Sequence, residues 1–376
     1  MSDNHLTYFK VENFKKFDSL EVKNIGQFNL IVGDNNVGKT CLLEALTINE
    51  RFKTTISYFS QLLVKRNIKT ESFFSYKGLN VDENFKNNEI ALYQRDLNKS
   101  IKFSINETRI EIQNLKEKIK ESKNVEINKF VEEVDLFSYG EIIPNSSNWI
   151  VFRLNDEIKF LADLTSDYYF DFLIDQKTVP AVMLSEKVEN YLTETYSLIY
   201  GKLNYGDKVS EVLNLIFQDV KVIDLRIFDN IGPFNRSELL IKTVNKNEYH
   251  SIREYGEGFI RCLHFIFLIL ANQSTRICID EIDTGIHHTK LKKNWEIIFK
   301  LCKELDVQLF ATTHSKECAE NFVEAGKILN ENIQQELRLI ELYEAKNVIY
   351  SGTVSEIGNI EYSVKNLPFR GENIYG

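Results

Sequence analysis

The sequence predicts an α/β protein with a β-hairpin region and a helical region between the two ends of its core. Three patterns carry this prediction. Apolar strands alternate with helices at both ends of the chain, strand alternation marks residues 101–112, and helical spacing dominates residues 191–216. The 376 residues exceed the usual size of a single core, so we expect one large domain with an insertion, or two lobes.

The first element is an apolar run at residues 28–32, which is followed by GDNNVGKT and then by CLLEAL. This order predicts a buried strand, a glycine loop and a helix start, the context of a phosphate-binding P-loop. We expect Lys39 to reach the β- and γ-phosphates and Thr40 to offer its hydroxyl to Mg²⁺. The predicted nucleotide-binding residues of this loop are Gly33, Asp34, Asn35, Asn36, Val37, Gly38, Lys39, Thr40 and Cys41. The chain is therefore predicted to bind a nucleoside triphosphate.

A second apolar strand, at residues 276–279, ends in Asp280 and Glu281. Carboxylates at the end of a buried strand can complete a phosphate site. We expect Asp280 to hold Mg²⁺, directly or through water, and Glu281 to act as the general base that polarises the attacking water. Alone this pattern is weak, but together with the P-loop it predicts triphosphate hydrolysis.

A helical pattern over residues 289–305 precedes a further strand over residues 307–315, and His314 lies at the end of that strand. The carboxyl end of a parallel strand is where ligand-binding groups lie. We expect His314 to hydrogen-bond the γ-phosphate. The alternative is a loop histidine with a structural role.

The glycine-containing turn Tyr255, Gly256, Glu257 and Gly258 opens a long apolar helix and predicts a second anion site. Far more than one βαβ unit separates the P-loop from the acidic strand. A second subunit, arranged head to tail, could bring its turn to the phosphates bound by the first.

The order of P-loop, glycine turn, Ile-Asp-Glu strand and Thr-Thr-His-Ser resembles the ATP-binding-cassette ATPases of the RecF/SMC type. It is more closely similar to the OLD-like AAA ATPases found in bacterial defence loci. Residues 8–17 resemble the first strands of that group. In the turn, Gly256 and Arg261 match the transporter signature, whereas Glu257 and Gly258 depart from it. Residues 283–287 resemble the D-loop region, which makes His287 an interface or packing residue.

The resemblance implies an ABC-type fold with a mixed central sheet, an antiparallel β lobe and a helical insertion lobe. The expected division is 1–62 for the N-terminal part of the core, 63–250 for the insertion, and 251–376 for the C-terminal part. Within the insertion, the hairpin at residues 101–112 would belong to the β lobe, and the polar pattern from Leu115 to about Val134 predicts a short helix. Residues 149–152 predict another strand.

The favoured function is a Mg²⁺-dependent ATPase that dimerises around ATP and acts as a sensor or regulatory subunit for a separate effector in anti-phage defence. This role follows from the resemblance alone. The chain after His314 is too short for the TOPRIM nuclease of OLD proteins. Two alternatives stay open: a RecF-type repair ATPase that binds duplex DNA, and a scaffold that binds ATP and hardly hydrolyses it. Adenine is not distinguished from guanine.

Composition places further limits on function. The net charge of −9 does not support nucleic-acid binding, which would need a local basic patch. The five cysteines form no C-x-x-C pair, as expected of reduced core residues in a cytoplasmic protein. The N-terminus lacks a signal-peptide pattern, and the apolar run 259–271 is interrupted by charge and too short to span a membrane. We expect it to form a buried helix.

Overall fold

The computed structural model describes residues 5–49, 93–96, 98–115, 124–133, 149–163, 169–171, 181–184, 189–201, 206–218, 220–231, 236–273 and 275–367. The predicted boundary between residues 62 and 63 lies outside the described residues. The three-part division of the chain therefore stays a prediction.

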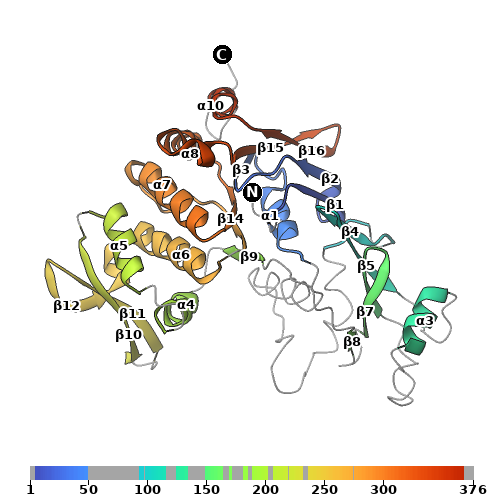
Figure 1. The fold of residues 1–376 in the computed structure, drawn as a ribbon, viewed down its shortest axis with the longest axis horizontal. Helices are drawn as coiled ribbons and strands as arrows, with labels where there is room; N and C mark the ends of the chain where they lie inside the picture. The colour runs from blue at the N-terminus through green and yellow to red at the C-terminus, as the bar shows by residue number, and fades with distance from the viewer. Residues whose placement is uncertain are drawn as a thin grey trace.

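A mixed six-stranded sheet forms the centre of the fold (Figure 1). Its order is β16, β15, β3, β14, β13 and β9. All neighbours pair in parallel except β15 and β16, which form an antiparallel hairpin. The bounds are β3 (Phe28–Gly33), β9 (Ala181–Leu184), β13 (Arg276–Ile279), β14 (Gln308–Thr312), β15 (Leu337–Ala345) and β16 (Val348–Val354). Strands β13 and β14 are buried along their whole length, as expected for parallel strands covered on both faces.

Helices cover both faces of this sheet, so that two hydrophobic cores form. One face packs against α1 together with the strands of the N-terminal hairpin. The other packs against the apolar sides of α6, α7, α8 and α10. The helices are α1 (Lys39–Leu46), α6 (Glu257–Ala271), α7 (His288–Glu304), α8 (Lys316–Ile328), α9 (Glu331–Gln334) and α10 (Ile357–Asn366). The predicted buried helix at residues 259–271 is α6.

An antiparallel seven-stranded sheet, in the order β2, β1, β4, β5, β6, β7 and β8, lies beside the central sheet (Figure 1). The α/β fold with a mixed sheet is confirmed, and this second sheet is the expected β lobe. Its bounds are β1 (Tyr8–Phe14), β2 (Phe17–Lys23), β4 (Ile101–Ile105), β5 (Thr108–Leu115), β6 (Trp149–Leu154), β7 (Glu157–Asp163) and β8 (Tyr169–Asp171).

The expected helix from Leu115 is wrong at its start. Leu115 is the last residue of β5 and pairs with Trp149 of β6. The helix α3 spans Val125–Glu133, and residues 116–123 and 134 lie outside the described residues. Pairing with β6 extends β5 beyond its alternating apolar residues, which is a long-range effect that local spacing does not encode.

A third unit packs on α6 and contains two helices and a three-stranded antiparallel sheet. Its elements are α4 (Glu189–Gly201), α5 (Gly206–Ile216), β10 (Val222–Ile231), β11 (Arg236–Thr243), β12 (Lys246–Ser251) and the short 3-10 helix η5 (Ile252–Tyr255). The helices α4 and α5 form the helical region predicted at residues 191–216. Because η5 leads directly into α6, the unit is joined to the glycine turn.

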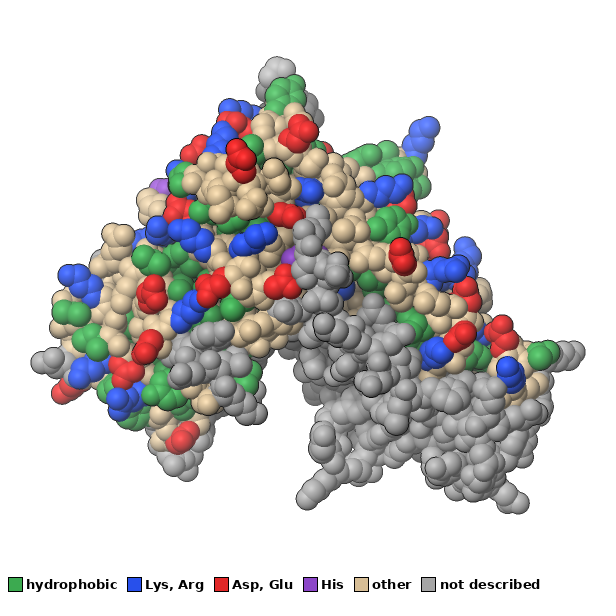
Figure 2. Space-filling view, in the orientation of Figure 1, with side chains coloured by type: hydrophobic (Ala, Val, Ile, Leu, Met, Phe, Trp, Pro, Cys, Tyr) green, Lys and Arg blue, Asp and Glu red, His purple; other side chains and the backbone are tan. Residues whose placement is uncertain are grey.

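The surface visible in Figure 2 carries cationic and anionic side chains interspersed over its described part. No single-sign track is visible among the described residues on this face. None of the described helices is both long and apolar enough to cross a membrane.

Candidate functional site

The P-loop joins the end of β3 to the start of α1 and depends on two glycines with positive φ. Gly33 has φ 142° and Gly38 has φ 108°. A Cβ at Gly33 would overlap the backbone oxygen of Leu342, and a Cβ at Gly38 would lie 3.0 Å from the ring of Phe17. Both positions therefore need glycine. The start of α1 offers an anion its N–H groups and a favourable dipole.

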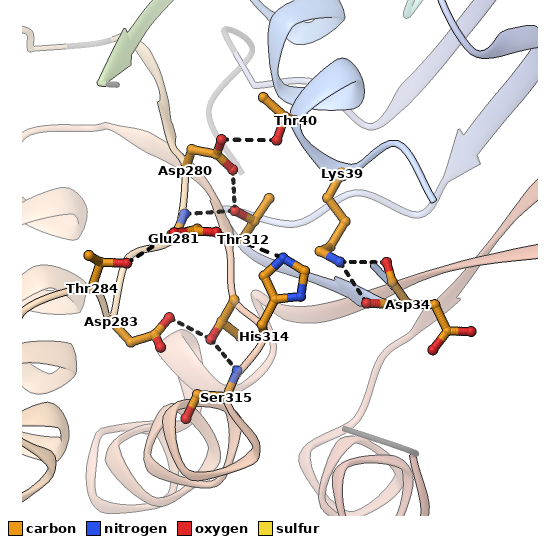
Figure 3. A network of polar contacts seen from close by, with 12 residues as sticks. Asp34, Lys39, Thr40, Asp280, Glu281, Asp283, Thr284, Thr312, His314 and Ser315 are labelled. Carbon is orange, nitrogen blue, oxygen red and sulfur yellow. Dashed lines mark hydrogen bonds and ion pairs between the residues drawn. The ribbon is translucent and has the colours of Figure 1, made fainter. Parts of the chain in front are cut away.

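The ammonium of Lys39 is folded onto its own loop (Figure 3). It donates to the carbonyl oxygen of Gly33 at 2.6 Å and to that of Asp34 at 2.8 Å. Burial lowers the pKa of Lys39 to about 8, against the opposing effect of nearby carboxylates, first among them Asp280. A buried cation held by neutral carbonyl oxygens is suited to an anionic ligand, which would further stabilise its charged form.

Asp280 connects the acidic strand to the P-loop. Its Oδ2 accepts a hydrogen bond from Thr40 Oγ1 at 2.9 Å, although the two residues are 240 positions apart in the sequence. Its Oδ1 accepts a hydrogen bond from Thr312 Oγ1 at 2.6 Å. Since β13 and β3 both run toward this edge with β14 between them, parallel pairing brings the loop and the acid together.

Glu281 and His314 face one another on the open side of this edge (Figure 3). Glu281 has a left-handed backbone with φ 48°. Its Oε2 accepts a hydrogen bond from Thr284 Oγ1 at 3.2 Å. Its Oε1 lies 3.9 Å from His314 Nε2. Glu281 is 44% exposed at its side chain, so a water molecule can approach the carboxylate.

The glycine turn contacts the segment of residues 283–287 that follows the two acids. Gly256 has φ 84° and ends η5 just before α6. A Cβ at Gly258 would lie 2.6 Å from the carbonyl oxygen of Gly285, and the side chain of Glu257 packs over Gly285. The ring of Tyr255 packs against Phe259. These contacts join the turn to the segment that follows the two acids.

His287 serves as the N-cap of α7, with its Nδ1 3.4 Å from the N–H of Thr289. The side chain therefore has a structural role in this chain. Cys41 lies in the first turn of α1 and is partly buried.

Two contributing residues escaped sequence reasoning. Thr312 contacts both acidic residues, since its hydroxyl donates to Asp280 and accepts from Glu281. Arg276 donates from Nη1 to the carbonyl oxygens of Leu46 at 2.6 Å and Ile48 at 3.4 Å. Strand β13 and the residue that follows it thus hold both ends of α1, through Asp280 at the start and Arg276 at the end. In the sequence, Arg276 is marked only by being a cation at the start of a buried strand. That pattern does not predict that its partners are the carbonyl oxygens at the end of α1.

We expect Arg276→Met to lower the free energy of unfolding by about 2 kcal/mol, because it removes the charged donor from two buried carbonyl oxygens. Urea unfolding measures this difference. Arg253→Met, at an exposed position of η5, is the control. Equal stability of the two variants would contradict the role given to Arg276.

The site residues fit ATP and Mg²⁺. The hydroxyl of Thr40 and the carboxylate of Asp280 supply the oxygen ligands that Mg²⁺ prefers, 2.9 Å apart. The ammonium of Lys39 lies at the glycine loop, where phosphate oxygens can take the place of its carbonyl partners.

A P-loop at the end of one parallel strand, joined to carboxylates at the end of another, defines the class of P-loop nucleoside triphosphatases. Residues 202–317 match the family model described as "AAA domain, putative AbiEii toxin, Type IV TA system". The match includes the glycine turn, both acids and His314. Together, site and match support an ATPase.

Similar proteins are known. A protein of Helicobacter pylori named ATP/GTP phosphatase is 25% identical over 339 residues, which cover 83% of this chain and 85% of that protein. The SMC head domain from Thermotoga maritima is 12% identical, with a TM-score of 0.43. The match covers 93% of this chain and 99% of that domain. An Smc head domain from Pyrococcus furiosus, bound to the C-terminal domain of ScpA, is 11% identical, with a TM-score of 0.47. The match covers 96% of this chain and 98% of that structure. Likeness at this level assigns no role to the chain.

Proposed function

We propose that this protein binds ATP at the loop Gly33–Cys41 and hydrolyses it with Mg²⁺ held by Thr40 and Asp280. The observation that carries the proposal is the hydrogen bond between Thr40 and Asp280, because it joins the P-loop to the acidic strand at one edge of the sheet. Bound Mg²⁺ would neutralise charge on the phosphates.

The remaining roles are assigned from the positions of the side chains. Lys39 balances phosphate charge, and the carboxylate of Glu281 takes a proton from the attacking water. His314 lies beside Glu281, at 3.9 Å, where it can bond to the γ-phosphate. The support for these roles is the grouping of the three side chains around the loop.

The direct test is turnover. The purified protein should release phosphate from ATP in the presence of Mg²⁺ and lose this activity when Mg²⁺ is chelated. Because the H. pylori relative is named ATP/GTP phosphatase, GTP is tested in parallel. Absence of release from either nucleotide would overturn the proposal.

Two subunits would complete the site. The turn Tyr255–Gly258 packs against Gly285 of its own chain, and a helix start there can bind an anion. In a head-to-tail dimer, each turn would close over the nucleotide held by the other subunit. Hydrolysis would then be coupled to opening of the dimer.

The biological role is proposed as that of a sensor or regulatory subunit for a separate effector in anti-phage defence. Its support is the resemblance of the motifs to defence ATPases, and a matched family whose description names a toxin–antitoxin system. The test is phage plating on bacteria that carry the complete locus. Wild-type protein should reduce plaque numbers and Lys39→Ala should not; equal plating would overturn the defence role.

We expect His314→Ala to slow hydrolysis more than it weakens ATP binding, because the side chain acts beside the catalytic carboxylate rather than in the loop. Steady-state turnover and equilibrium binding separate the two effects. His288→Ala, at an exposed position in α7, is the matched control. Equal losses of turnover and affinity would indicate a structural histidine instead.

A further inference from the structure

Two neighbouring threonines at the end of β14 contact the segment that carries the acids. Thr312 Oγ1 donates to Asp280 Oδ1 at 2.6 Å and accepts the N–H of Glu281 at 2.8 Å. Thr313 Oγ1 donates to Asp283 Oδ1 at 2.6 Å. The two threonines are 1% and 0% exposed. Each therefore holds one end of the segment from Asp280 to Asp283 (Figure 3).

The hydroxyl of Thr312 has its hydrogen-bonding roles fixed by its partners. A backbone N–H can only donate, so the hydroxyl must accept from Glu281. Its single proton then goes to the carboxylate of Asp280. One oxygen atom thus joins the side chain of one acid to the backbone of the other. With Oδ1 engaged in this way, Oδ2 is turned toward Thr40.

The backbone of Glu281 needs this support. Its φ of 48° lies in the left-handed region, which costs a non-glycine residue about 1–2 kcal/mol. Thr312 supplies two acceptors that hold the turn, its hydroxyl for the N–H of Glu281 and its carbonyl oxygen for the N–H of Ile282 at 3.0 Å. The N–H of Thr284 closes the turn on the carbonyl oxygen of Glu281, also at 3.0 Å.

We propose that Thr312 is a positioning residue for ATP hydrolysis. Its hydroxyl keeps the carboxylate of Asp280 toward Thr40 and holds Glu281 in the backbone conformation that presents its carboxylate to the open edge. The inference rests on the proposed function, and it requires the hydroxyl itself, because a branched side chain of the same shape would leave both partners without their bonds.

The experiment compares Thr312→Val, which keeps the shape, with Thr312→Ser, which keeps the hydroxyl. We expect the valine variant to lose about 10- to 100-fold in kcat, as is typical when a group that orients metal ligands is removed. Its ATP affinity should stay near the wild-type value, and serine should restore most of the rate. Thr353→Val is the matched control, since the buried Thr353 hydroxyl has no hydrogen-bond partner among the described residues.

Wild-type kcat in the valine variant would overturn the inference, as would a serine variant as slow as the valine one. If the valine variant does not fold, Thr312→Ser and Thr312→Ala repeat the comparison, since they differ only in the hydroxyl. Hydrogen exchange of the amides of Glu281 and Ile282 gives a second readout. We expect faster exchange without the hydroxyl, and unchanged exchange would overturn the inference. If the wild-type protein hydrolyses no nucleotide, the proposed function fails, while the exchange measurement still decides the role of Thr312.

Discussion

Replacing Lys39 by alanine is expected to weaken ATP binding by about 100-fold, because the two charge-assisted hydrogen bonds that its ammonium would donate to phosphate oxygens, worth about 3 kcal/mol in total, cannot form. The side chain is buried, 5% exposed, at the mouth of the glycine loop. Calorimetric titration with ATP at pH 7 measures the change. Lys300→Ala, which removes an exposed charge from α7, should bind as the wild type does.

The same residue gives the binding a pH dependence. Burial lowers the pKa of Lys39 to about 8 in the free protein, so the charged form is lost as the pH rises through this value. Affinity should therefore weaken above about pH 8 in the wild type. In the folded free protein the lowered pKa also means that stability increases with pH between 8 and the ordinary lysine value, because the unfolded chain binds more protons there.

For the alanine variant, the contradicting result is an ATP affinity equal to that of the wild type. Unchanged ATP affinity in Lys39→Ala would remove the P-loop assignment.

The second large effect is expected at Glu281. Glu281→Gln keeps the shape of the side chain but removes the base, and general bases contribute about 10²- to 10⁴-fold. We expect turnover to fall by at least about 100-fold with ATP still bound. The bound state should then accumulate, and light scattering with Mg-ATP should show an increase in solution mass to a dimer or a multiple of it.

Glu320→Gln, at an exposed position of α8, is the control for a surface carboxylate. Wild-type turnover in Glu281→Gln would show that another group acts as base. A mass that stays monomeric with Mg-ATP would contradict the two-subunit site, and a mass already high without ATP would contradict ATP-driven assembly. Phosphate release by the wild-type protein is measured in its own assay, so a failure of hydrolysis is distinguished from a failure of assembly.

Local sequence patterns were sufficient for the elements that carry the site. The apolar run before Gly33 predicted β3 correctly, and the apolar run that ends in the two acids predicted β13. A strand that is buried on both faces of a parallel sheet is a short continuous run of apolar residues, which can be recognised locally. The alternation of apolar residues within 101–112 predicted the hairpin of β4 and β5, because successive side chains of a strand point to opposite faces of the sheet. Leu115 was placed wrongly because its conformation depends on a partner strand that is distant in the sequence.

The sequence by itself determined the kind of chemistry, since glycines, a lysine, a threonine and paired acids in this order have few other uses. The tertiary structure decided which groups meet. The contact of Thr40 with Asp280 depends on two strands that run parallel toward one edge. Thr312 and Arg276 acquire their partners in the same way, through hydrogen bonds that cross from one element to another. Spacing along the chain encodes periodicity within an element, whereas these contacts follow from the path of the chain between elements.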